Sequence, residues 1–211
     1  LAAATAGEAC TSLVLTTTSG AQVYGRTMEF GVDLQSEGVV IPRGYALAAT
    51  GPDGKPGLGW TTTYAAAGLN AFGLPILADG VNEKGLAGGM LLFPGYAGYV
   101  PVAEADPARA IAGWDFLTWA LTNFATVAEV RAALGGIEIS DVPQPQMGGV
   151  LPLHYTLVDE TGARLVVEPI GGKLVAHDNP LGVLTNAPSF DWHITNLGNY
   201  VNLTSLDALP R

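Results

Sequence analysis

The chain has 211 residues, of which 48% are hydrophobic and 13% are charged, and its formal net charge is −10. This length and apolar content are sufficient to bury the core of one domain. The acidic balance argues against a nucleic-acid partner, because binding to phosphates requires a surface rich in Lys and Arg. No run of about 18 apolar residues occurs, so we expect no membrane insertion. The single cysteine, Cys10, excludes an internal disulfide and a cluster of metal-binding thiolates.

The first residues of the chain, 1–9 (LAAATAGEA), are rich in small side chains and end in Gly7-Glu8-Ala9. This ending fits the small-x-small pattern that precedes a signal-peptidase cut. We therefore expect residues 1–9 to be a leader or propeptide, residues 10–211 to form the domain, and the protein to be periplasmic or secreted. A plain N-terminal extension is the open alternative, and with it a cytoplasmic location.

Two strands are predicted at 11–18 and 22–30, both rich in Thr, Val and Leu, and Ser19-Gly20 between them predicts a hairpin. Further strands are expected at 38–41, 60–66, 72–78 and 86–93. The segment DGVNEKG, between the last two, has the composition of a turn.

The periodicity changes to a helical one in residues 108–135, where Trp114, Leu117, Leu121 and Phe124 recur at helical spacing. Thr126 lies three positions before Glu129, which is a capping-box pattern and predicts the start of a second helix.

Alternation returns after a loop rich in proline at 142–152, and it predicts strands between residues 153 and 186. Ser189 is then a candidate cap for a last helix within 189–200. The order of strands, helices, strands and a helix predicts an α+β fold.

Cys10 is the first candidate for chemistry. Free cysteine is often a small buried hydrophobe, and this remains the plainer interpretation. If the chain is cut after Ala9, however, Cys10 carries a free α-amine with a pKa near ~8 beside a thiol with a pKa near ~8.5. One residue then supplies both nucleophile and base. In the predicted hairpin Arg26 lies near Cys10, where a cation favours thiolate, and Glu29 follows as a candidate partner of the amine. The alternative for these two is an ordinary surface ion pair.

Four segments taken together resemble the choloylglycine hydrolase family, which contains bile salt hydrolases and penicillin V acylases and belongs to the N-terminal-nucleophile hydrolases. The segments are CTSLVL with VYGRTMEF, ADGVNEKGLAGGMLLFPGYAGY (78–99), LHYTLVDETGARLVVEP (153–169) and VLTNAPSFDWHITNLGNY (183–200). They occur in the order of the family and cover nearly the whole chain after residue 9.

The resemblance implies a four-layer αββα sandwich and roles for particular residues. Cys10 is the nucleophile, with its freed amine as base, and Arg26 tunes the thiolate. Glu29 stands where the family most often has aspartate. Asn82 and Asn186 are implied donors to the oxyanion, although a turn-former and a strand-end residue are their plainer interpretations. No metal or organic cofactor is implied.

The resemblance also implies an activity, the hydrolysis of a non-peptide carbon–nitrogen amide bond in a small molecule. Substrates of the penicillin V, conjugated bile salt or acyl-homoserine-lactone type are expected. Family members continue past SLDALPR (205–211) with further strands and a second functional arginine. We therefore expect a fold that is incomplete at its C-terminal end, and either a homo-oligomer or a pairing with a missing C-terminal chain.

Two other functions stay open at this stage. One is an acid-ceramidase-like fatty acyl amidase, which also uses an N-terminal cysteine. The other is a non-catalytic binding module on the same fold. The three histidines, His154, His177 and His193, have no metal-ligand spacing and are expected to be structural or surface residues.

Overall fold

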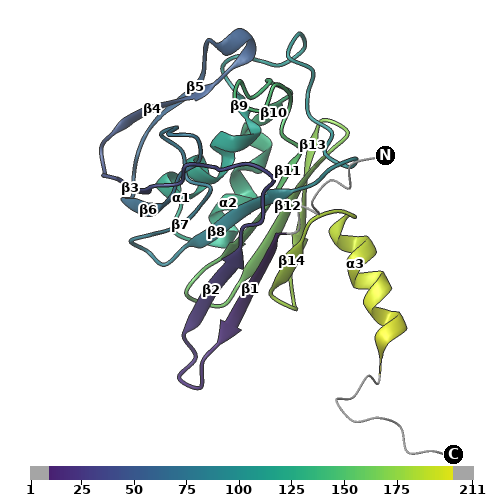
Figure 1. Cartoon of the computed structure of the whole chain (residues 1–211). Helices are drawn as coiled ribbons and strands as arrows, with labels where there is room; N and C mark the ends of the chain where they lie inside the picture. Colours follow the sequence, from purple (N-terminus) through teal and green to yellow (C-terminus); the bar gives the residue numbers. More distant parts are fainter. Residues whose placement is uncertain (1–9, 202–211) are drawn as a thin grey trace, which may run out of the picture.

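The computed structural model describes residues 10–201 and contains two main β-sheets and three α-helices (Figure 1). The expected leader, residues 1–9, and the final segment with Arg211 lie outside the described residues. The helices are α1 (Phe116–Asn123), α2 (Val127–Ala133) and α3 (Phe190–Leu197). The strands are β1 (Thr11–Thr16), β2 (Gln22–Thr27), β3 (Gly38–Ile41), β4 (Ala46–Thr50), β5 (Pro56–Thr61), β6 (Ala66–Leu69), β7 (Asp79–Asn82), β8 (Ala87–Leu92), β9 (Ala110–Ala112), β10 (Glu138–Ser140), β11 (Leu153–Val158), β12 (Arg164–Ile170), β13 (Lys173–Asp178) and β14 (Val183–Thr185).

The large sheet has the order β13-β12-β11-β8-β7-β6-β3, and the small sheet has the order β14-β1-β2. All neighbours within these two sheets are antiparallel. In the small sheet Thr11 lies opposite Thr27 on one side and Thr185 on the other. The strand β1 is therefore the central strand of the small sheet, between β2, which follows it directly in sequence, and β14, which is distant in sequence.

Two consecutive glycines in β8 define how the layers stack. A Cβ atom at Gly88 would lie 3.3 Å from the Leu117 side chain of α1, whereas one at Gly89 would lie 2.3 Å from the Tyr24 hydroxyl of β2. Because successive residues of a strand point to opposite faces, α1 covers one face of the large sheet and the small sheet covers the other. The missing side chains at these positions allow both neighbours to approach β8 closely.

The main hydrophobic core lies between the helices and the large sheet and includes the buried residues Phe116, Leu117, Leu121 and Tyr155. A second, smaller cluster consists of Cys10, Leu91, Val166, Leu184 and Phe190, which come from both sheets and from α3. We call it the inter-sheet cluster. Cys10 therefore belongs to the layer between the two sheets.

Most of the predicted elements are confirmed. The opening hairpin, β3 and α3 occur where they were expected, and Thr126 and Glu129 form the predicted capping box at the start of α2. Two predicted strands are wrong. Residues 60–66 include the turn between β5 and β6, and residues 72–78 form no strand. Phe72 and Gly73 have φ angles of 57° and 65°, and Pro75 lacks an N–H, so the chain turns here and β7 begins only at Asp79.

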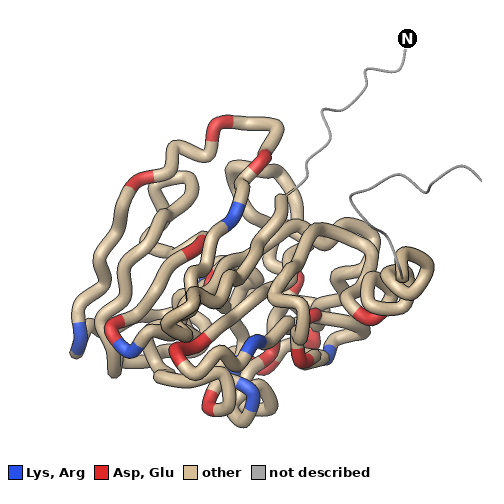
Figure 2. The backbone as a smooth tube through the Cα atoms, turned by 90° about the horizontal axis from the view of Figure 1, so that it is seen from below, with Lys and Arg blue, Asp and Glu red and all other residues tan. Residues whose placement is uncertain are grey.

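No helix among residues 10–201 combines the length and the apolar character needed to cross a bilayer. Figure 2 shows the Lys and Arg positions of this part of the chain lying among Asp and Glu positions.

The close approach at Gly89 leads to a first prediction. Gly89→Ala should lower the free energy of unfolding by about 1–3 kcal/mol, because the new methyl group displaces the buried Tyr24 ring. Urea denaturation measures this change. Gly25→Ala is the matched control, since a Cβ atom there meets nothing within 4 Å and should change stability by less than about 0.5 kcal/mol. If both substitutions changed the free energy of unfolding equally, the close contact between β8 and Tyr24 would be contradicted.

Candidate active site

The alternation of side chains along the small sheet decides which residues share the inter-sheet layer. Ser12 lies opposite both Arg26 and Leu184. Continuing this register two residues back along β1 from Ser12 places Cys10 between Met28 and Asn186. Because the side-chain period of a strand is two, all of these residues point to the same face of the sheet. The burial of Cys10 and Ser12, at 2% exposure each, shows that this face is the one turned towards the large sheet.

Cys10 is buried but lines a hollow of about 60 Å³. This space has room for about two water molecules. The Cys10 thiol donates a long hydrogen bond to the Glu29 carbonyl at 3.7 Å, and the Cys10 carbonyl accepts one from Thr185 Oγ1 at 3.0 Å. The lining is otherwise mostly apolar and consists of Arg26, Met28, Phe30, Leu34, Ala71, Phe72, Ala78, Met90, Leu91, Leu92, Leu151 and Leu153.

Arg26 also lines this hollow, so its expected proximity to Cys10 is confirmed. Arg26 Nη1 donates to the Met90 carbonyl at 2.7 Å and to the Ala78 carbonyl at 3.4 Å. Its Nε donates to the carbonyl of Thr27 at 3.3 Å. The guanidinium therefore joins the small sheet to the large sheet at the edge of the site, instead of forming the surface ion pair with Glu29 that was the alternative.

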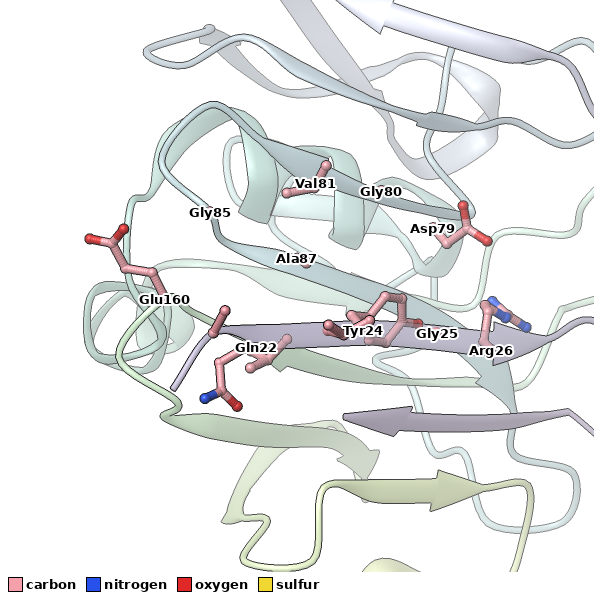
Figure 3. A pocket seen from close by; sticks show the side chains of 13 residues that line it. Gln22, Tyr24, Gly25, Arg26, Asp79, Gly80, Val81, Gly85, Ala87 and Glu160 are labelled. Carbon is pink, nitrogen blue, oxygen red and sulfur yellow. The ribbon is translucent and has the colours of Figure 1, made fainter. Parts of the chain in front are cut away.

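Tyr24 and Asp79 are neighbours of Arg26 that sequence reasoning did not identify. Burial raises the pKa of Tyr24 well above its usual value, and the Arg26 charge only partly opposes this shift. Burial also raises the pKa of Asp79, again against the effect of Arg26. Figure 3 shows Asp79 and Arg26 at one end of a groove that runs along β2. The sequence indicated a turn at Asp79 and gave no sign that β2 and β7 line the same groove.

Glu29 lies just beyond β2 and its side chain is exposed. Its backbone carbonyl, and not its carboxylate, is the group that contacts the Cys10 thiol. The proposed partner of its carboxylate, a free α-amine on Cys10, depends on removal of residues that lie outside the described part of the chain. The role of the carboxylate therefore stays a prediction.

The structure corrects the expectation for Asn82. Its side-chain oxygen accepts from the N–H groups of Lys84 and Leu86 at 2.9 and 3.0 Å. Its amide donates to the carbonyls of Leu121 and Phe124 at 2.8 and 2.7 Å. These bonds organise the turn before β8, whereas the Cys10 hollow lies at the other end of β8, about 17 Å further along the strand. Asn82 is thus a buried turn-former, and it does not join Cys10.

Asn186 follows β14 and lies opposite Cys10 in the register of the small sheet. It is 9% exposed, and its carbonyl accepts a hydrogen bond from His193 Nε2 at 3.1 Å. The sequence-based prediction that Asn186 stands beside the cysteine is consistent with this register, although its role stays a prediction.

The histidines are more closely integrated than the sequence indicated. His154 is fully buried, stacks on Phe93 with ring centroids 4.5 Å apart, and has Nδ1 at 3.2 Å from Glu168 Oε1. His177 approaches the other Glu168 oxygen at 3.5 Å. Within residues 10–201 no group of His, Cys, Asp and Glu side chains is arranged to hold a metal ion. Glu168 could have been found from the sequence, because it is a charged residue two positions after Val166 in a predicted strand and therefore points to the same face.

Comparison with known proteins decides the family. The sequence model of the linear amide C–N hydrolases, choloylglycine hydrolase family, matches residues 10–209. The chain belongs to the choloylglycine hydrolase family. The match begins at Cys10, the residue that the small sheet places in the inter-sheet layer.

Individual relatives agree with this assignment. The bile salt hydrolase/transferase of Clostridium perfringens is 38% identical over 196 residues, which are 92% of this chain and 58% of that protein. A crystal structure of a variant of the conjugated bile acid hydrolase from the same organism superposes with a TM-score of 0.81 at 37% identity, covering 94% of this chain and 60% of that one. The penicillin V acylase of Agrobacterium tumefaciens superposes with a TM-score of 0.77 at 26% identity, covering 95% and 60%. The fold is the αββα sandwich of the N-terminal-nucleophile hydrolases, and this choloylglycine hydrolase family chain spans about three-fifths of the length of these relatives.

The contacts of Arg26 lead to a second prediction. Arg26→Met should lower the free energy of unfolding by about 1–3 kcal/mol, because the Met90 carbonyl loses its donor in a partly buried layer. Arg43→Met is the matched control, since Arg43 is exposed and pairs only with Glu83 at the surface, where ion pairs contribute about 0–1 kcal/mol. Denaturant titration of both variants tests the difference. If the Arg26 variant is no less stable than the control, its bridging role is refuted.

Proposed function

We propose that the protein is an amidase that cleaves a linear, non-peptide amide with Cys10 as an N-terminal nucleophile. The observation that carries the proposal is the convergence of the Cys10 thiol and the Arg26 guanidinium on one hollow. Reactive cysteines characteristically lie beside cationic side chains, whereas structural buried cysteines do not. Family membership supports the same reaction class, since the matching family is that of linear amide C–N hydrolases.

The proposed reaction has two halves. The Cys10 α-amine takes the thiol proton and the thiolate attacks the amide carbonyl carbon, while the Asn186 amide donates to the developing oxyanion. The carbon–nitrogen bond then breaks as the Cys10 α-ammonium returns that proton to the leaving nitrogen. Water then attacks the thioester carbonyl, the amine accepts its proton, and the carboxylic acid leaves from the sulfur. All of the groups required are in the protein, the substrate and the solvent.

The lining of the hollow supports an apolar acyl group. Apart from Arg26 and Cys10, the residues around the hollow carry hydrocarbon, aromatic or thioether side chains. Apolar walls with few polar groups are typical of sites for small hydrophobic ligands. The named relatives act on bile salts and penicillin V, and an acyl-homoserine lactone has the same combination of an amide and an apolar acyl chain.

Turnover by the full-length gene product tests the proposal. We expect hydrolysis of at least one of phenoxyacetyl, glycocholate and acyl-homoserine-lactone amides, and loss of that hydrolysis in Cys10→Ala, because no other cysteine can replace the nucleophile. A fatty acylethanolamide in the same panel tests the acid-ceramidase-like alternative. Rapid labelling of Cys10 by a substrate-like electrophile distinguishes an enzyme from a binding module. Undiminished hydrolysis by Cys10→Ala would exclude this mechanism.

We propose further that the active form begins at Cys10 after export from the cytoplasm, because only then does the residue carry a free amine. The composition of residues 1–9 supports removal by a signal peptidase, and self-cleavage of a zymogen is the competing route. Intact-mass analysis of protein isolated from its host should show a chain that starts at Cys10. An active enzyme that retains Leu1 would contradict this.

The small sheet covers only part of the large sheet, and this supports a further part of the proposal. The row Val40, Ala67 and Val81 crosses β3, β6 and β7, and Val40 and Val81 are 73% and 45% exposed. Beside this row a groove of about 700 Å³ follows β2, which pairs with β1 alone among the described strands (Figure 3). We propose that polypeptide equivalent to the remaining length of the relatives adds strands at β2 and covers this row. The same mass measurement tests this: a monomeric mature chain that stops at Arg211 would oppose it.

A further inference from the structure

The large sheet carries a buried carboxylate that the proposed reaction does not use. Glu168, on β12, is 0% exposed, and its side chain points into the layer between the sheets, like that of Val166 two positions earlier. A buried carboxylate is costly unless hydrogen bonds and charges compensate it. Its contacts therefore indicate what the position requires.

The first contact is to the start of α3. Glu168 Oε1 accepts a hydrogen bond from the backbone N–H of Phe190, the first residue of that helix, at 2.9 Å. The first N–H groups of a helix lack partners within the helix, and a carboxylate satisfies them well. Ser189, the predicted cap, instead donates its hydroxyl to Asp191 Oδ1 at 2.5 Å. Glu168, which is distant in sequence, thus caps this helix.

The remaining contacts hold the carboxylate in place. His154 Nδ1 lies 3.2 Å from Oε1, and His177 Nε2 lies 3.5 Å from Oε2, so the two oxygens face histidines on the two neighbouring strands. Burial lowers the pKa of His154, against the opposite effects of Glu168 and of the Thr185 backbone. His154 is therefore neutral near pH 7, and its Nδ1–H donates to Glu168.

Helix α3, which Glu168 caps, contacts the region of the active site through two of its residues. The Phe190 ring is 4% exposed and packs in the inter-sheet cluster with Cys10. One turn later, His193 of the same helix donates from Nε2 to the Asn186 carbonyl at 3.1 Å. Helix α3 is therefore joined to the segment that carries Asn186 and, through Phe190, to the inter-sheet cluster that contains Cys10.

We propose that Glu168 is a positioning residue for the amidase site, acting through the Phe190 N–H and α3 to hold Asn186 opposite Cys10. The expected effect on kcat rests on the proposed function. The expected effect on the structure around Asn186 does not depend on activity. Glu168 is not among the residues that line the hollow beside the Cys10 thiol.

Two substitutions separate its hydrogen bonding from mere space filling. Glu168→Gln keeps an oxygen for the Phe190 N–H and turns an amide NH2 towards His177 in place of Oε2, and it should retain kcat within about fivefold. Glu168→Met has a similar length and no acceptor, and it should lower kcat about 100-fold with KM within threefold, because loss of alignment acts on the chemical step. Glu104→Gln and Glu104→Met, at an exposed glutamate, are the matched controls and should leave both constants unchanged.

A double-mutant cycle in the full-length protein tests whether the effect passes through Asn186. Glu168→Met combined with Asn186→Ala should be no slower than Asn186→Ala alone. The proposal would be overturned if the double variant lost kcat by the product of the two single losses, or if Glu168→Met alone kept full kcat.

Hydrogen exchange gives a readout that needs no substrate. Peptides covering residues 186–190 should exchange faster in Glu168→Met than in the wild type, and should be unchanged in Glu168→Gln and in the Glu104 variants. Unchanged exchange in Glu168→Met would refute the positioning role, even if the wild type hydrolyses amides. Faster exchange in a protein that hydrolyses none of the amides tested would retain the positioning of Asn186 and reject the proposed function.

Discussion

The structure depends on the pairing of β1 with two strands at once. β2 follows it directly, whereas β14 is separated from it by most of the chain, and both are antiparallel to it in one continuous register. The start of β1 lies between the end of β2 and the end of β14 in this arrangement. Cys10, Arg26 and the segment of Asn186 are brought together by backbone hydrogen bonding before any side chain contributes.

The second constraint is the narrow space between the two sheets. Gly89 allows Tyr24 and Arg26 to pack directly on β8, so the Arg26 guanidinium reaches the carbonyls of Met90 and Ala78. Buried polar groups of this layer are held by partners from other elements: Arg26 donates to the carbonyls of Met90 and Ala78, and Glu168 Oε1 accepts from the Phe190 N–H. The hollow beside Cys10 therefore combines apolar walls with a single cation held in a defined position.

These two features explain why Cys10 is only 2% exposed and still lines a hollow. Its burial arises from the layer in which it lies, and the hollow beside it keeps a path to the sulfur. The uncovered row of the large sheet and the free edge of β2 belong to the same layer. Arg26 lines both the hollow beside Cys10 and the groove that follows β2, so the site and this edge of the small sheet are contiguous.

The sequence by itself determined the local elements and the central residue. The hairpin, the capping box at Thr126 and the helical pattern of α1 depend on near neighbours. The family segments gave the candidate site residues Cys10, Arg26, Glu29, Asn82 and Asn186. Only the tertiary structure decided that the Asn82 amide binds carbonyls at the end of α1, away from Cys10, and that Glu168 caps α3, because these depend on hydrogen bonds to residues at least twenty positions away. Such contacts arise from the stacking of layers and from strand order, and neither composition nor periodicity records which distant segments will meet.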